Sequence, residues 1–238
     1  MNEKFSIKKA LWFGFSEVIE HFAYFIVIMM MYVGTMLGGL VLGLPIAWLP
    51  FASDIFRISQ TIQMVGVPQA EWSKLIMSET SSGLTIATAI LLIFIYFLYG
   101  ALSLGLIRIA LDYYQYGKST FQALFSCFHL VIRYGIATFL YALMCGIGLM
   151  FFIVPGIYFA ITYGFYGYAM VDKDAGIFDS FAISRDITRG YKMDLLGFCF
   201  LLWLIKWAAL SLIGIAWIVV LPASLLADAY VYKRLLGE

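Results

Sequence analysis

The chain has 238 residues, of which 63% are hydrophobic and only 12% are charged. A soluble domain has about 25% charged and about 45–50% apolar residues. The core of a soluble domain of this size could not bury the additional apolar residues of this chain. The composition therefore excludes an ordinary soluble domain. The net charge of +1 gives no support to nucleic-acid binding, which needs a dense basic face.

Intervals without charged residues predict where the chain crosses a lipid bilayer, because about 20 apolar helical residues span the hydrocarbon layer. One crossing is expected in residues 22–53 and one in 80–107. Two crossings are expected in 134–171 and two in 195–227, where Lys206 is the only charge. The predicted fold class is all-α, an integral membrane helical bundle of about six transmembrane helices.

Two details of this path stay open at the level of the sequence. Residues 22–53 either cross once with a tilt or fold back near Gly38. The first hairpin turns either at Gly146–Gly148, with Pro155 kinking the next helix, or at Pro155–Gly156, since proline is tolerated at both kinds of position.

The whole chain, residues 1–238, is predicted to be a single transmembrane domain. Within it we expect a cytoplasmic amphipathic segment (1–21), an extracytoplasmic loop (51–83) and a cytoplasmic connector (172–194). Twelve of the fifteen Lys and Arg residues lie on one predicted side, and three (Arg57, Lys74 and Lys206) lie on or nearest the other. Because cytoplasmic segments are enriched in Lys and Arg, both termini are predicted to be cytoplasmic.

A weak internal repeat pairs a glycine with a proline seven or eight residues later, near the extracytoplasmic end of three apolar stretches. The pairs are Gly38 with Pro45, Gly148 with Pro155 (next to Gly156), and Gly214 with Pro222. An amphipathic segment precedes each stretch. We therefore predict three pseudo-repeated helical pairs with interfacial amphipathic helices, in which these residues act as hinges or helix breaks. Chance or ordinary packing explains the spacing equally well.

No catalytic constellation is recognisable, and no metal or cofactor site is expected. The two histidines, His21 and His129, are far apart in the sequence, whereas a metal site needs several converging ligands. We assign both to structural roles at the cytoplasmic interface.

Ionisable groups near the membrane are the remaining candidates for function. Lys206 lies between Trp203 and Trp207, either as a contact to lipid or solute or as a side chain reaching the interface beside two aromatic anchors. Asp228 is either an interfacial cap or the ion-pair partner of a cation such as Arg108 or Arg133. In the connector, Arg185 and Arg189 are candidate lipid or partner contacts within a stretch of mixed charge.

Several short motifs between Tyr99 and Leu235 resemble a family of uncharacterised multi-pass bacterial membrane proteins, which are similar to the membrane domain of glycerophosphoryl diester phosphodiesterases. The resemblance rests on Gly146-Ile-Gly148, residues 154–158 (VPGIY), 171–173 (VDK), Ser180 to Ser184, 189–191 (RGY), and Pro222 with 229–232 (AYVY). It implies a six-span bundle in the bacterial cytoplasmic (inner) membrane. The phosphodiesterase chemistry of the fused relatives belongs to a separate soluble barrel, so the resemblance transfers no catalytic residue.

The leading hypothesis is a non-enzymatic integral membrane protein that binds membrane lipids or other membrane protein subunits as an accessory subunit. A small-solute transporter or channel component is the alternative, because broken helices often line substrate sites. A lipid-modifying enzyme is the third.

Overall fold

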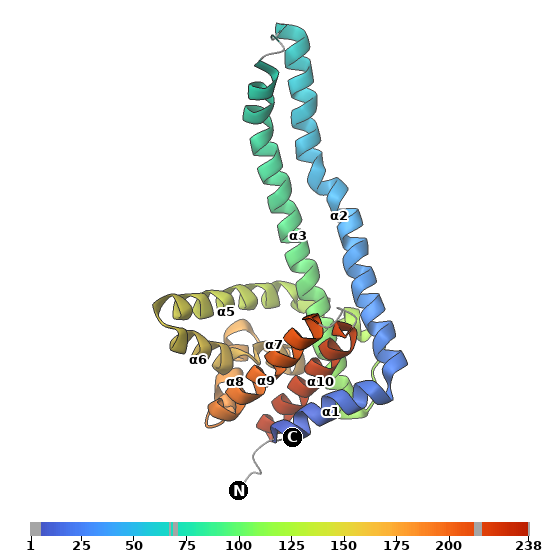
Figure 1. Cartoon of the computed structure of the whole chain (residues 1–238), viewed down its shortest axis with the longest axis vertical. Coiled ribbons are helices and arrows are strands. Elements are labelled where there is room, and N and C mark those ends of the chain that lie inside the picture. Colours follow the sequence, from blue (N-terminus) through green and yellow to red (C-terminus); the bar gives the residue numbers. More distant parts are fainter. Residues whose placement is uncertain (1–5, 67, 69–70, 212–215, 238) are drawn as a thin grey trace. The chain divides into compact units, whose positions relative to one another are not determined.

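The computed structural model describes residues 6–66, 68, 71–211 and 216–237, which are nearly all helical and include no strand (Figure 1). The helices are α1 (Ile7–Glu20), α2 (Phe22–Val65), α3 (Trp72–Tyr116), α4 (Ala123–Ser126), α5 (Val131–Phe151), α6 (Ile153–Tyr163), α7 (Tyr166–Lys173), α8 (Ile177–Thr188), α9 (Lys192–Ser211) and α10 (Trp217–Leu236), with a 3₁₀ turn, η2 (Phe128–Leu130), before α5. The predicted all-α class is confirmed.

Four segments in the described part of the chain are long and apolar enough to cross a membrane. They are Phe22–Pro45 in α2, Ile86–Tyr116 in α3, Ala123–Phe151 ending with α5, and Lys192–Ser211, which is α9. Most of each segment is not buried inside the protein. Apolar helices that leave their side chains uncovered are what a lipid environment requires, so the fold is compatible with a membrane protein.

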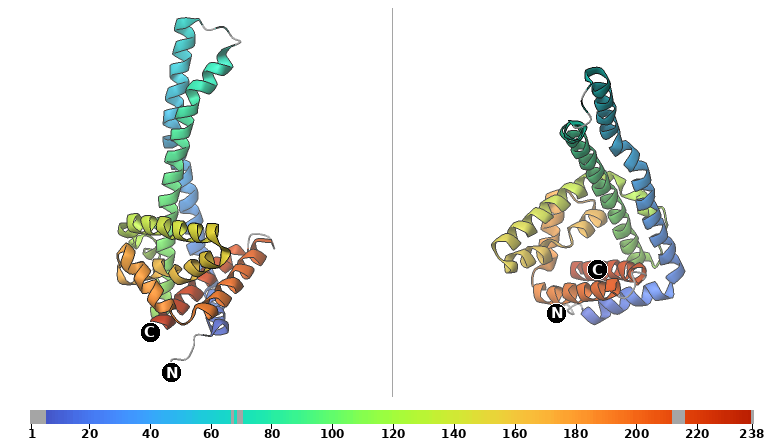
Figure 2. Two further views of the ribbon diagram at one scale, coloured as in Figure 1. Left: turned by 90° about the vertical axis from the view of Figure 1, so that its left-hand side faces the viewer. Right: turned by 45° about the horizontal axis from the view of Figure 1, so that its top comes forward.

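The chain divides into two compact units, whereas a single domain is predicted from the sequence. One unit is residues 33–99, and the other joins residues 1–32 to 100–238. In the first, the end of α2 and the start of α3 form an antiparallel hairpin (Figures 1 and 2). Two glycines let the helices approach: a Cβ at Gly39 would overlap Leu98, and one at Gly43 would lie 2.8 Å from Phe94.

α2 is one unbroken helix, which answers the question left open for residues 22–53: the chain does not fold back near Gly38. Gly38 is exposed and Pro45 lies inside the helix, so the predicted break at this pair is wrong. The predicted loop 51–83 is also largely helical. α2 continues to Val65, and α3 begins at Trp72.

The expected amphipathic helix at the N-terminus is α1, which lies along α10 (Figure 1). Its buried side consists of Ala10, Gly14 and Val18, spaced four residues apart. A Cβ at Gly14 would overlap the Ala223 carbonyl oxygen of α10, so this glycine sets the close crossing. The large apolar residues lie elsewhere on the helix, and Trp12 is 75% exposed. This arrangement suits a helix that packs through small residues and turns large ones toward lipid.

The first hairpin turns at Phe152, which is extended between α5 and α6. Pro155 is the third residue of α6, where a missing N–H costs nothing because the first-turn N–H groups lack helical partners. Gly148 and Gly156 face each other across the turn, and a Cβ at Gly148 would lie 2.9 Å from the Gly156 Cα. The helix break thus lies between Gly148 and Pro155, with the turn next to Pro155–Gly156.

The third predicted break falls only partly within the described residues. α9 ends at Ser211 and α10 begins at Trp217, and Gly214 lies among the residues that are not described. Pro222 is buried inside α10, which continues through it to Leu236. The helix is therefore not broken at Pro222.

The connector 172–194 contains α8. Side chains on the buried face of this helix form hydrogen bonds to backbone groups between α6 and α7. α6 ends at Tyr163 and α7 begins at Tyr166, which leaves backbone groups without helical partners. Ser184 Oγ donates to the Thr162 carbonyl (3.0 Å) and accepts from the Phe165 N–H (3.2 Å). Thr188 donates to the same carbonyl (3.2 Å). The Thr162 carbonyl and the Phe165 N–H at this break are thus satisfied by side chains of α8.

Candidate functional site

A cavity of about 690 Å³ lies among α5, α6, α7, α9 and α10. Its lining is Tyr141, Ile157, Ala160, Ile161, Gly164, Phe165, Tyr168, Leu195, Leu196, Cys199, Phe200, Trp203 and Asp228. We call it the Asp228 cavity, because Asp228 is the one charged residue among the described residues that line it. Its size falls in the range of about 300–1,000 Å³ that is usual for small-molecule sites.

Helix geometry explains why these residues share one cavity. Leu195, Cys199 and Trp203 are spaced four residues apart on α9, so they form one stripe along that helix. Ile157, Ile161 and Gly164 repeat at four and three residues on the facing side of α6 and at its end. The turn at Phe152 returns α6 antiparallel to α5, which brings α6 beside Tyr141.

Asp228 has no ion-pair or hydrogen-bond partner among the described residues. The cations considered for it from the sequence are used elsewhere: Arg108 pairs with Asp112 on α3 (3.1 Å), and Arg133 pairs with Asp174 (3.5 Å). The proposed structural ion pair of Asp228 with these residues is therefore wrong. Lys206 of α9 is the cation whose field reaches the Asp228 carboxylate, without forming a salt bridge.

The cavity's two tyrosines already use their hydroxyl protons within the protein. Tyr141 donates to the Ala160 carbonyl oxygen (3.2 Å), and Tyr168 donates to the Leu225 carbonyl oxygen (3.2 Å). A phenolic oxygen that has donated its proton can still accept a hydrogen bond. Together with the carboxylate, the site therefore offers acceptors, and Cys199 contributes only a thiol, which is a weak donor.

The structure brings together some of the predicted contact residues. Trp203 and Asp228 line the same cavity, and half-buried Lys206 acts on it from one side. Trp203 also contacts the ring of Trp207, with centroids 6.0 Å apart, but Trp207 is exposed and does not line the cavity. The aromatic pair thus runs from the cavity to the outer surface of α9.

Arg185 and Arg189 do not join this site. Both are exposed, and Arg185 pairs with its neighbour Asp186 (3.5 Å). The face of α8 that matters for the cavity is the opposite one, Ser180, Ser184 and Thr188, which is fully buried. These three hydroxyl residues are spaced four apart, which is the sequence signal for a polar stripe on one face of a helix. The charged residues between them made this spacing hard to recognise.

Sequence reasoning also missed Tyr141, Tyr168 and Cys199 as lining residues. Each lies in an apolar interval without a charged neighbour, so nothing local distinguishes it from a residue facing lipid. Only the pairing of α6 with α5 and α9 places them on one cavity.

A second, polar pocket of about 650 Å³ includes Arg108, Asp112, His129, Asp172 and Asp174 in its lining. The acidic residues of this pocket are paired with basic residues. Asp172 binds Lys233 (2.9 Å), and both side chains are largely buried. Tyr232 donates a further hydrogen bond to Asp172 (3.2 Å). This network ties α7 to α10, and its internal pairing contrasts with the unpaired Asp228.

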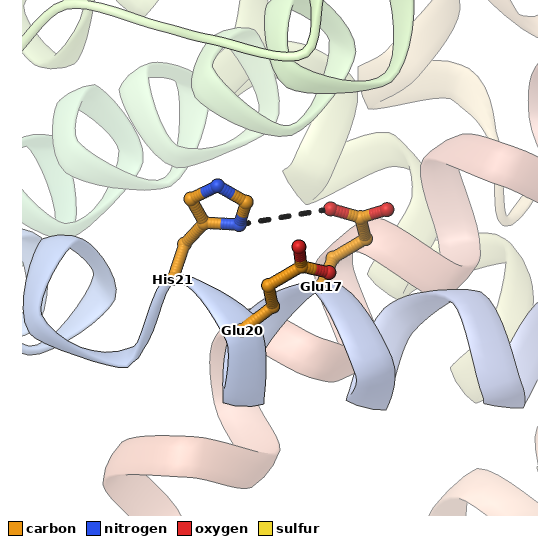
Figure 3. A group of neighbouring side chains, drawn as sticks. All are labelled: Glu17, Glu20 and His21. Atoms are coloured by element: carbon orange, nitrogen blue, oxygen red, sulfur yellow. Dashed lines mark ion pairs between the residues drawn. The ribbon is translucent and has the colours of Figure 1, made fainter.

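Glu17, Glu20 and His21 form a further cluster at the corner between α1 and α2 (Figure 3). Each offers a ligand atom, and these atoms lie within 4.8 Å of one another. His21 Nδ1 is 3.9 Å from Glu17, and the Tyr113 hydroxyl lies 2.7 Å from His21 Nδ1 and 3.3 Å from Glu17 Oε2. Tyr113 therefore ties this corner to α3, a structural role like the one expected for His21.

No family model, no curated protein and no solved structure matches the chain. The function is therefore inferred from the geometry of the sites.

Proposed function

We propose that the protein is a non-enzymatic integral membrane protein that binds a lipid or similar amphiphile in the Asp228 cavity. Its role would be that of an accessory subunit to other membrane proteins. The observation that carries the proposal is the cavity itself, which is mostly apolar, contains one carboxylate and is bounded by α9, a helix apolar enough to cross a membrane. Sites of this kind bind molecules with a large apolar part and a small polar group.

We further propose six crossings, arranged as three helical pairs. The four long apolar segments supply four of them. α6 with α7, and α10, supply the other two. The support is that α6 pairs with α5 and α10 with α9, while Ile153 and Val154 at the start of α6 are at least 70% exposed. Both termini would face the cytoplasm of a bacterial inner membrane, in keeping with the Lys and Arg bias and with the family resemblance.

The orientation is tested by cysteine labelling in a background without Cys127, Cys145 and Cys199. Ser73→Cys and Asp186→Cys both place the thiol at an exposed position. An impermeant maleimide added to intact cells should label the first and reach the second only after lysis. The reverse pattern would contradict the orientation.

Lipid binding is tested by purifying the protein in a mild detergent and measuring bound lipid by native mass spectrometry. Ala160→Trp fills the cavity, whereas Ala142→Trp adds the same side chain at an exposed position of α5. The first variant should lose the bound lipid and the second should keep it. Equal lipid retention by both variants, with both folded, would contradict binding in this cavity.

A further inference from the structure

Asp228 is a half-buried carboxylate on the wall of the cavity. It lines an apolar cavity and has neither a salt bridge nor a hydrogen bond there, whereas the acids of the polar pocket, such as Asp112, Asp172 and Asp174, are each paired with a cation. Desolvating a carboxylate without a partner is costly, and a bound cation or strong donor removes most of that cost.

The Trp203 indole N–H is a donor on the cavity wall, but neither it nor any other described lining residue donates a hydrogen bond to Asp228. Tyr141 and Tyr168 direct their hydroxyl protons to the backbone oxygens of Ala160 and Leu225. The site therefore presents a surplus of acceptors, and a ligand that complements it must bring donors. An ammonium group brings three and carries the opposite charge.

Resting on the proposed function, we infer that the ligand of the Asp228 cavity is an amphiphile with a primary ammonium head, which pairs with Asp228 while its apolar chain lies against α6 and α9. Trp203 lines the same cavity, and an indole face stabilises an ammonium group in a desolvated site. Leu195, Leu196 and Phe200 provide apolar surface for the chain.

Lys206 distinguishes between two kinds of ammonium amphiphile. It does not line the cavity, but its charge acts on Asp228. A phosphoethanolamine head carries an anionic phosphate next to its ammonium, so Lys206 would stabilise the phosphate while Asp228 holds the ammonium. A simple alkylamine gains nothing from Lys206. The two sources share the ammonium contact and differ in their dependence on Lys206.

The experiment compares three probes of equal chain length, hexadecylamine, hexadecanol and palmitate, on delipidated protein in a maltoside detergent, with occupancy measured by native mass spectrometry. We expect hexadecylamine to bind at least about tenfold more tightly than the other two, as a charge-assisted hydrogen bond implies. Asp228→Asn should reduce its affinity to that of the alcohol. Asp186→Asn, at an exposed position of α8, is the matched control and should change nothing.

Asp228→Glu guards against a folding defect, because it keeps the charge and should keep the preference for the amine. Equal binding of the three probes, or an amine preference that survives Asp228→Asn, would overturn the inference and leave lipid binding intact. No binding of any probe would overturn the proposed function as well. Hexadecylphosphoethanolamine identifies the source: only its binding should fall in Lys206→Met if the natural head is phosphoethanolamine.

Discussion

The two compact units are built from equally apolar sequence but hold together by different means. In residues 33–99 large side chains such as Val41 and Met64 are exposed, and the helices meet through side-chain contacts at Gly39 and Gly43. In the other unit, polar networks such as Asp172–Lys233 are buried among fully covered apolar residues. Exposed apolar helices and close glycine contacts therefore occur in both units, whereas the buried ion pair of Asp172 and Lys233 belongs to the second.

Breaking the buried ion pair should have the largest effect. Lys233→Met leaves Asp172 without its cation at a largely covered position, and we expect a loss of about 3–5 kcal/mol in the free energy of unfolding. Thermal unfolding in detergent, followed by circular dichroism, measures it. Lys74→Met, exposed in the hairpin unit, should change stability by less than about 0.5 kcal/mol.

The double variant Asp172→Asn with Lys233→Met removes both charges and should recover much of this stability. If the double variant is as unstable as the single one, the loss comes from packing at Lys233 and not from an unpaired carboxylate.

Two glycines should respond to alanine with opposite signs. A Cβ at Gly105 would overlap the Leu124 carbonyl oxygen, so Gly105→Ala should destabilise by about 1–3 kcal/mol or more. Gly38 has nothing within 4 Å of its Cβ position, and Gly38→Ala in the middle of α2 should stabilise by up to about 1 kcal/mol. The same unfolding measurement compares them, and equal effects would contradict the difference between the units.

Removing the hydroxyl that bridges α6 and α7 should cost about 1–3 kcal/mol, because Ser184→Ala leaves the buried Phe165 N–H without its acceptor. Hydrogen exchange at Phe165 should accelerate. Ser59→Ala is the control in the hairpin unit, where the hydroxyl is exposed and bonds only within its own turn. Unchanged exchange at Phe165 would show that another group satisfies this amide.

The smallest effect is expected on the outer face of α8. Arg185 is exposed and pairs only with exposed Asp186, so Arg185→Ala should change stability by less than about 0.5 kcal/mol and leave lipid retention unchanged. If lipid or a second protein is lost from the purified complex in this variant, Arg185 is a contact residue after all.

The sequence predicted the helical class and the positions of the long apolar segments, because these depend on local hydrophobicity. It also drew attention to Trp203 and Asp228, which line one cavity, since charged and aromatic residues in apolar stretches are conspicuous. It did not predict that α2 continues beyond 53, because polar residues after Ser53 are compatible with a loop or a helix. Nor did it assign Lys233 to Asp172, because that pairing depends on how α7 and α10 pack.

The hydroxyl bridge from α8 has a mechanical consequence. Gly164 and Phe165, at the break it satisfies, belong to the wall of the Asp228 cavity. Pulling α8 away would strand the Thr162 carbonyl and the Phe165 amide where no water replaces the lost bonds. That penalty favours a fixed position of α8 against the cavity wall. A displacement of α8 would therefore also change the wall of the Asp228 cavity.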